Sequence, residues 1–267
     1  MHLDRNANLL TDTPNEVALA VAAALSSEAE LLSLALSCRR YSAKCIVAPH
    51  VARDAVPSAQ RADSQRWSIV EEAARQWLSQ CSEQERNWVP RRGEESWIGL
   101  MREVRLLRQA PMFAQSHKDI VLSDCGSRAT CGKQNDFDWC TAASEQVMRA
   151  GCHSAQFTLL SGSCAFGVIR PCYKVDDGHG APWIEEHCFY DTTDGECLPG
   201  RQDWVGMQSA TPGDRVSMLL DLDKGSMAIY KNGKWLGVMV GSDLGGEYCW
   251  AVDLSDDHSS ARIGPAR

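Results

Sequence analysis

Apolar and polar residues alternate through residues 211–254, and this alternation predicts four consecutive β-strands. Four apolar residues recur with a period of two and therefore share one face of the first strand: Val216, Met218, Leu220 and Leu222. Three further strands are expected at residues 227–230, 235–240 and 248–254. The whole segment is expected to form a meander that buries one face of each strand.

Asn232 and Gly233 separate the second of these strands from the third. Both residue types tolerate the positive φ angles of a two-residue hairpin turn, which makes this dipeptide the strongest local signal in the chain. We therefore expect a tight β-hairpin with its turn at this point.

The spacing of apolar residues becomes helical in the first 110 residues. Thr13, Pro14 and Glu16 form a capping box with proline at the first helical position. Ser27 and Glu30 offer a second capping box ahead of a strongly apolar run. Short helices are expected up to about residue 47, and the Ala-, Pro-, Ser- and Arg-rich residues 48–66 are expected to be a linker.

Two more helices are expected before the strands begin, at residues 68–80 and 96–107. Residues 81–95 contain Pro90 and Gly93 and are expected to form a loop. From residue 112 onward, short strand-like runs appear at 120–122, 146–148, 155–159 and 165–169. The chain is therefore expected to be an α+β multidomain protein, with helices first and strands after them.

The charge of the chain is concentrated in its second half. Residues 111–267 carry 13 Lys+Arg and 21 Asp+Glu, which accounts for the whole net charge of −8. Phosphate binding needs clustered basic charge, so we expect no nucleic-acid partner. The acidic balance permits a basic peptide partner, although scattered Asp in turns explains it equally well.

The 12 cysteines form no CxxC pair. No run approaches the length of a membrane span, and acidic Asp12 and Glu16 precede the apolar stretch where a signal peptide would be positive. These features favour a cytoplasmic or nuclear protein with reduced thiols and no membrane partner. A zinc site could be built from Cys125, Cys131, Cys140, Cys152 and His153. These residues lack the close sequence pairing typical of structural zinc sites, so no metal or other cofactor is expected.

A series of short motifs follows one another through the strand-rich half of the chain. The earlier ones are at residues 151–157, 166–169, 188–190, 194–195 and 204–207. The later ones are Gly213-Asp214, residues 220–223, residues 230–233 and Leu236-Gly237. In their order and spacing these motifs resemble a SPRY domain. The resemblance covers residues 112–263 and implies a C-terminal antiparallel β-sandwich of the concanavalin-like kind.

SPRY domains bind proteins or peptides through loops at one edge of the sandwich. The resemblance therefore implies a binding site on the loops near residues 124–139, 176–187 and 190–204. Aromatic and Arg side chains are the usual anchors of such interfaces. The residues expected to contact a ligand are Arg128, Trp183, Tyr190 and Trp204. For each of them, a role in packing is an equally good interpretation.

The helical segment at residues 10–47 contains Pro14-x-Glu16-Val17, Leu25, Leu31-Leu32-x-Leu34 and the run at residues 37–41. With these motifs the segment resembles an F-box. The resemblance implies docking on the Skp-type adaptor of a cullin–RING ubiquitin ligase. The residues expected to form the adaptor-binding face are Pro14, Val17, Val21, Leu25, Leu31, Leu32 and Leu34. The alternative is a helical mini-domain that packs on the rest of the chain.

These resemblances divide the chain into an F-box-like module at 10–47, a linker at 48–66, two connecting helices at 67–111 and a SPRY β-sandwich at 112–263. Together they imply a non-enzymatic substrate receptor, which would bring an unidentified target protein to a ligase. No phosphate-binding or dinucleotide glycine pattern is present, and no constellation of catalytic residues is recognisable. The alternatives are an interaction scaffold with no link to ubiquitin and a lectin-like carbohydrate binder.

Overall fold

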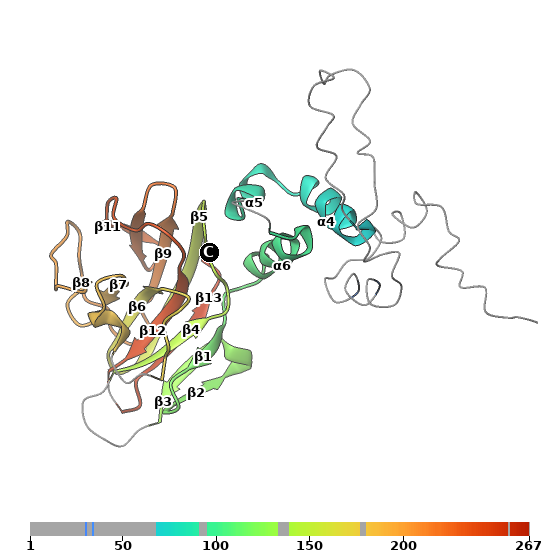
Figure 1. Cartoon of the computed structure of the whole chain (residues 1–267). Helices are drawn as coiled ribbons and strands as arrows, with labels where there is room; N and C mark the ends of the chain where they lie inside the picture. The colour runs from blue at the N-terminus through green and yellow to red at the C-terminus, as the bar shows by residue number, and fades with distance from the viewer. Residues whose placement is uncertain are drawn as a thin grey trace, which may run out of the picture. The chain divides into compact units, whose positions relative to one another are not determined.

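The structure is a computed structural model that describes Glu30, Leu34 and residues 68–90, 95–132, 139–176, 180–255 and 257–266. The chain divides into two compact units. The first comprises Met1–Arg86 and Arg91–Arg105, and the second comprises Asn87–Pro90 and Leu106–Arg267. Figure 1 shows the helices of the first unit in blue-green and the strands of the second from green to red.

Two helices lie where their apolar spacing predicts them. Helix α4 (Ile69–Ser79) begins at the N-cap Ser68, whose side chain accepts a hydrogen bond from the Glu71 N–H at 3.3 Å. Helix α6 (Trp97–Arg108) begins after Ser96, whose hydroxyl accepts from the Gly99 N–H at 3.0 Å. Each buries one apolar face, so the predicted helices at 68–80 and 96–107 are confirmed.

The prediction of a loop at residues 81–95 is wrong in its first part. Helix α5 (Glu83–Trp88) lies there. The Ser82 N–H donates to the Glu85 carboxylate at 2.8 Å, and the Ser82 hydroxyl accepts from the Glu85 N–H at 3.2 Å. This is a capping box, and it stabilises a helix start that apolar spacing alone does not reveal.

The F-box-like module at 10–47 and the linker at 48–66 lie almost entirely outside the described residues. Within that range the structure describes Glu30 and Leu34, both helical, with Glu30 exposed and Leu34 half-buried. The other residues of the expected adaptor-binding face are not described: Pro14, Val17, Val21, Leu25, Leu31 and Leu32. The resemblance to an F-box stays a prediction.

The strands of the second unit form two antiparallel sheets that make a β-sandwich (Figure 1). The six-stranded sheet has the order β1 (Phe113–Ser116), β4 (Cys140–Ser144), β12 (Cys249–Leu254), β6 (Cys164–Ile169), β7 (Cys188–Asp191) and β8 (Cys197–Leu198). The seven-stranded sheet has the order β11 (Lys234–Val240), β10 (Ser226–Lys231), β9 (Arg215–Asp221), β5 (Cys152–Ser161), β13 (Ser260–Gly264), β3 (Arg128–Cys131) and β2 (Ile120–Ser123).

The core lies between the two sheets. Phe157 of β5 and Phe166 of β6 stack with their ring centroids 4.9 Å apart, and Trp250 of β12 meets Phe157 edge-on at 6.2 Å. All three side chains are buried. Aromatic contacts between strands of opposite sheets are therefore central to the packing of the sandwich.

The expected four-stranded meander is confirmed for three strands and wrong for the fourth. Strands β9, β10 and β11 are consecutive neighbours in the seven-stranded sheet, and Asn232 and Gly233 form the hairpin turn with φ angles of 51° and 80°. Strand β12 instead lies between β4 and β6 of the other sheet. Every residue of β12 is buried, since it has neighbours on both sides and is covered on both faces.

The other strand predictions have mixed outcomes. Those at 120–122, 155–159 and 165–169 are confirmed as parts of β2, β5 and β6. The one at 146–148 is wrong, because that segment makes an isolated bridge between Met148 and Tyr248 rather than a strand. The sequence pattern does not predict strands β1, β3, β4, β8 and β13.

Candidate functional site

The outer face of the six-stranded sheet is covered by the described parts of one segment, residues 170–176 and 180–187. A second apolar cluster fills the space beneath it, with members from β4, β6, β7, β8, β12 and the 3₁₀ turn η3 (Ala181–Trp183). His187 anchors the segment, since its Nδ1 is 2.8 Å from the Ala181 carbonyl oxygen and Tyr173 meets its ring edge-on at 5.0 Å. Burial lowers the pKa of His187, which keeps the imidazole neutral at pH 7.

Trp183 extends into solvent from this anchored segment. Its side chain is 46% exposed, although the preceding Ala181 and Pro182 are buried. Its ring meets that of Trp139 edge-on, with centroids 6.3 Å apart and planes at 85°. Trp183 is therefore a large apolar side chain held at the surface by a rigid base, as an interface anchor requires.

Arg201 lies over the Trp183 ring. Its guanidinium carbon is 5.8 Å from the ring centroid, which is within the range of a cation–π contact. The Arg201 side chain is 60% exposed and has a long ion pair with Glu196 at 3.8 Å. Trp183, Trp139 and Arg201 together are called the Trp183 surface below.

Asp253 of β12 lies buried behind the Trp183 surface. A Cβ atom added to Gly180 would be 2.8 Å from Trp139 Cβ and 3.2 Å from both Trp183 Cδ1 and Asp253 Oδ2, so the three side chains converge there. The Thr141 hydroxyl donates to Asp253 Oδ1 at 3.0 Å. Burial raises the pKa of Asp253 to about 8, against the opposing effects of Thr141 and the Ala181 N–H. The carboxyl is mostly neutral at pH 7.

Trp204 supports the neighbouring loop. It is half-buried, it packs against the main core, and its indole Nε1 donates to the Gly195 carbonyl at 2.7 Å. A Cβ on Gly237 of β11 would be 3.1 Å from its ring. The adjacent Val205 is 92% exposed, so Val205 contributes more than Trp204 to the solvent-exposed surface of this loop.

Tyr190 is a core residue on β7, with 0% of its surface exposed. Its hydroxyl donates to the Gln208 carbonyl oxygen, and burial raises its pKa. In this position Tyr190 offers no side-chain surface to a ligand, and its hydroxyl holds the following loop, residues 199–214, at Gln208.

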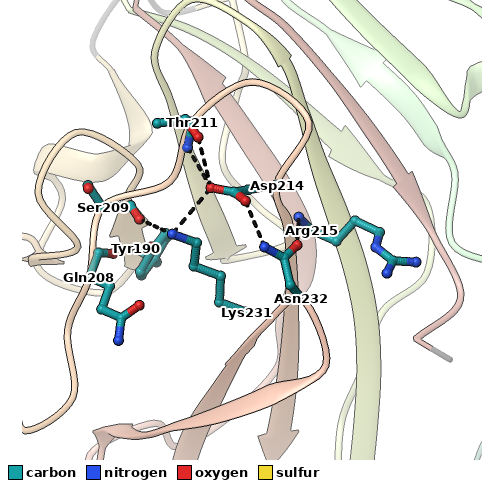
Figure 2. A network of polar contacts seen from close by, with 8 residues as sticks. All are labelled: Tyr190, Gln208, Ser209, Thr211, Asp214, Arg215, Lys231 and Asn232. Atoms are coloured by element: carbon teal, nitrogen blue, oxygen red, sulfur yellow. Dashed lines mark hydrogen bonds and ion pairs between the residues drawn. The ribbon is translucent and has the colours of Figure 1, made fainter.

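A polar network ties that loop to the β10–β11 hairpin (Figure 2). Asp214 accepts hydrogen bonds from the Thr211 N–H at 2.9 Å and from Asn232 Nδ2 at 2.7 Å, and it pairs with Lys231 at 3.2 Å. These contacts, the Thr211 N–H first, hold the pKa of Asp214 well below its usual range. Lys231 also donates to the Ser209 carbonyl at 2.6 Å, so residues 209–214 of the loop are tied to the hairpin.

Arg128 lies on strand β3 rather than on a loop. It is half-buried, and its Nε donates to the Ser260 hydroxyl of β13 at 3.1 Å. Of the four residues expected to contact a ligand, Trp183 has the exposure of an anchor, and Arg128 and Trp204 offer part of their surface. Arg201 and Trp139 are not among the residues expected from the sequence to contact a ligand. Both nevertheless lie within or at the end of the loops expected to form the binding site, at residues 190–204 and 124–139.

His187 and Cys188 are neighbours in the sequence, but their side chains lie on opposite faces of the six-stranded sheet. His187 belongs to the outer cluster, and Cys188 faces the core between the sheets, as the alternation of a strand requires.

Within the described part of the chain, no helix has the length and apolar character needed to cross a membrane.

Comparison with known proteins identifies this sandwich. Residues 156–247 match the SPRY domain family. The chain contains a SPRY domain. The match begins within β5 and ends just before β12, so it takes in Trp183 and Arg201 but not Trp139 or Asp253. SPRY domains are in general non-enzymatic modules that bind other proteins, which agrees with the expected function class.

Three solved structures are similar to the chain. The SPRY domain of human HERC1 is 16% identical, with 56% of this chain and 94% of that structure covered and a TM-score of 0.48. A human SPRY domain is 19% identical, with 57% and 97% covered and a TM-score of 0.44. The TRIM65 PSpry domain is 14% identical, with 60% and 92% covered and a TM-score of 0.45. None of the curated proteins matches the chain.

Proposed function

We propose that the SPRY domain of this chain binds a protein or peptide at the Trp183 surface. The observation that carries the proposal is the half-exposed Trp183 ring, which stands on a buried base with Trp139 at its edge and Arg201 over it. Tryptophan and arginine are the residues most enriched at the centres of protein interfaces. The anchored segment beneath Trp183 lowers the entropy cost of presenting the ring.

The exposed groups of the Trp183 surface indicate which side chains a partner would need in order to bind there. An apolar side chain would pack on the exposed part of the Trp183 ring. A carboxylate would replace the long Glu196 contact of Arg201, because a guanidinium binds a carboxylate best through two parallel hydrogen bonds. The favoured partner is therefore a peptide segment with an apolar residue close to an acidic one.

Selection of ligands from a displayed peptide library tests the proposal. The wild-type chain is expected to enrich peptides of this composition, and the Trp183→Ala chain is expected to fail to bind them. Trp235→Ala is the matched control, since Trp235 is a 54% exposed tryptophan on β11. Enriched peptides that bind the Trp183→Ala chain as well as the wild type would refute the assignment of the surface.

The finer proposal is that the chain is a substrate receptor of a cullin–RING ligase. Its support is the F-box resemblance of residues 10–47, which precede the SPRY domain as an adaptor-binding module precedes a target-binding one. The Skp-type adaptor would be one partner and the captured target the other. This role places the protein in the cytoplasm, the nucleus or both.

A pull-down of the purified chain with the Skp-type adaptor tests this finer proposal. Binding is expected for the parent and not for the Leu31→Asp/Leu34→Asp variant, with circular dichroism showing that the variant is folded. A well-folded parent that does not bind would leave the second candidate, an interaction scaffold with no ligase link. The third candidate, a lectin-like binder, rests on the same exposed tryptophan, and a glycan array without signal would remove it.

A further inference from the structure

A cluster of three side chains with metal-ligand chemistry lies at the end of the sandwich that carries the β1–β2 turn. It consists of His117, Asp119 and Cys140, and their ligand atoms all lie within 4.8 Å of one another. His117 and Asp119 belong to the turn, and Cys140 begins β4. The cluster has no residue in common with the Trp183 surface. It shares Cys140, and no other residue, with the zinc set weighed in the sequence analysis.

We propose that His117, Asp119 and Cys140 bind a zinc ion. Imidazole nitrogen, carboxylate oxygen and thiolate sulfur are the three protein donors that zinc accepts, commonly in a tetrahedral arrangement. Cys140 would lose its thiol proton to solvent on binding. The resulting thiolate and the Asp119 carboxylate would neutralise the two charges of the ion, which makes a largely buried site electrostatically acceptable.

The distances within the cluster are close to those that zinc requires. His117 Nδ1 lies 3.4 Å from Asp119 Oδ2. Two donors on bonds of about 2.1 Å to a tetrahedral ion are about 3.4 Å apart, so this pair is already spaced for a shared metal. A sulfur on a bond of about 2.3 Å would be about 3.6 Å from each. Because the ligand atoms all lie within 4.8 Å of one another, the largest separation would close by about 1.2 Å at most.

The state of the histidine suits a ligand. The Asp119 N–H donates to His117 Nδ1 at 3.3 Å, which places the lone pair of the imidazole, not its proton, on the side facing the carboxylate. A zinc ion would take this lone pair in place of the long hydrogen bond.

The backbone holds the three residues in place. The His117 N–H donates to the Thr141 carbonyl at 2.9 Å, which fixes the turn beside the start of β4, and the Ile120 N–H donates to the His117 carbonyl at 2.9 Å. The Gly132 N–H donates to the Asp119 carbonyl at 2.9 Å. His117 and Cys140 are buried, while the Asp119 side chain is 23% exposed and gives the ion a way in.

Cobalt(II) and zinc titrations of the full chain test this inference. After chelation and reduction, the wild type is expected to bind one zinc ion per chain. Cobalt is expected to produce a thiolate-to-metal charge-transfer band, which Cys140→Ala loses. Cys131→Ala is the matched control, because Cys131 is an equally buried cysteine of β3 outside the cluster, and it is expected to keep the band.

Asp119→Asn provides a second variant, at a partly exposed position where misfolding is not expected. It keeps the shape of the side chain and removes its charge, and it is expected to weaken zinc binding by at least about tenfold. Absence of stoichiometric zinc, a band that persists in Cys140→Ala, or an unchanged affinity in Asp119→Asn would each overturn the assignment. Each of these outcomes leaves the proposed peptide binding at Trp183 untouched.

Discussion

The guanidinium carbon of Arg201 lies 5.8 Å from the centroid of the Trp183 ring. The two residues come from different loops, one leading into β7 and one following β8. An exposed cation–π contact contributes about 0.5–1 kcal/mol, which is enough to favour one orientation of the tryptophan without burying it. The contact therefore leaves an aromatic face and a cation exposed together.

The free energy of unfolding should depend little on Trp183. Trp183→Ala is expected to cost about 1 kcal/mol, as for other half-exposed side chains. Phe166→Ala, which opens a cavity between the sheets, is expected to cost about 3–5 kcal/mol. Urea denaturation of both variants measures the difference. A cost for Trp183→Ala as large as that for Phe166→Ala would make Trp183 a core residue and remove its assignment as an anchor.

The buried Asp253 carboxyl predicts a pH dependence of stability. Its pKa is about 8 in the folded chain, compared with an ordinary value of 3.8. Between these values the folded state keeps a proton that the unfolded state loses, so stability falls as the pH rises from 4 to 8. The full slope for one proton is about 1.4 kcal/mol per pH unit.

Asp253→Asn removes this ionisation and keeps the shape of the side chain. The variant is expected to gain stability relative to the wild type as the pH is raised from 5 to 8. Denaturation curves of both proteins at pH 5, 6.5 and 8 measure the gain. Parallel pH profiles for the two proteins would show that Asp253 does not hold a proton in the folded state.

The hairpin turn at Asn232 should be sensitive to substitution. Asn232 has a φ of 51°, its side chain donates to Asp214, and its Oδ1 accepts from the Arg215 N–H at 2.9 Å. Asn232→Ala is expected to cost about 1–2 kcal/mol, from the positive φ and the lost hydrogen bonds. Asn232→Gly separates the two causes, because it relieves the φ and still loses the bonds. Equal stability of Asn232→Ala and the wild type would contradict this account of the turn.

Gly167 of β6 is required by a close approach of β7. A Cβ at this position would be 2.0 Å from the Cys188 carbonyl oxygen and 2.8 Å from the Phe189 Cα atom. Both are backbone atoms, so Gly167→Ala forces the two strands apart and is expected to cost more than about 3 kcal/mol or to prevent folding. Gly241→Ala is the milder comparison, because a Cβ there would have no atom within 4 Å and the backbone does not have a positive φ. A thermal shift as small for Gly167→Ala as for Gly241→Ala would show that β6 and β7 are not packed as described.

Local chemistry made parts of this fold predictable. The Asn232-Gly233 turn, the capping serines of α4 and α6 and the alternation of β9 each depend on neighbours within a few residues. The Ser82–Glu85 capping box is equally local, but no apolar spacing accompanies it, so the sequence does not indicate a helix at this point.

The placement of β12 depends on pairing with β4 and β6, which lie far away in the sequence. Its run from Cys249 to Leu254 is buried on both faces, so no alternation shows which sheet it joins. The candidate site is likewise predictable from the sequence only in part. A loop tryptophan such as Trp183 could be singled out by residue type, but its contact with Arg201 and the burial of Tyr190 follow from the tertiary fold.

The affinity of one selected peptide for three chains tests the central claim most directly. Isothermal titration with the wild type, Trp183→Ala and Trp235→Ala provides the comparison. We predict a loss of at least about tenfold, or about 1.4 kcal/mol, for Trp183→Ala and no change for Trp235→Ala. An unchanged affinity for Trp183→Ala, with the loss at Trp235→Ala instead, would contradict the account and move the binding surface to β11.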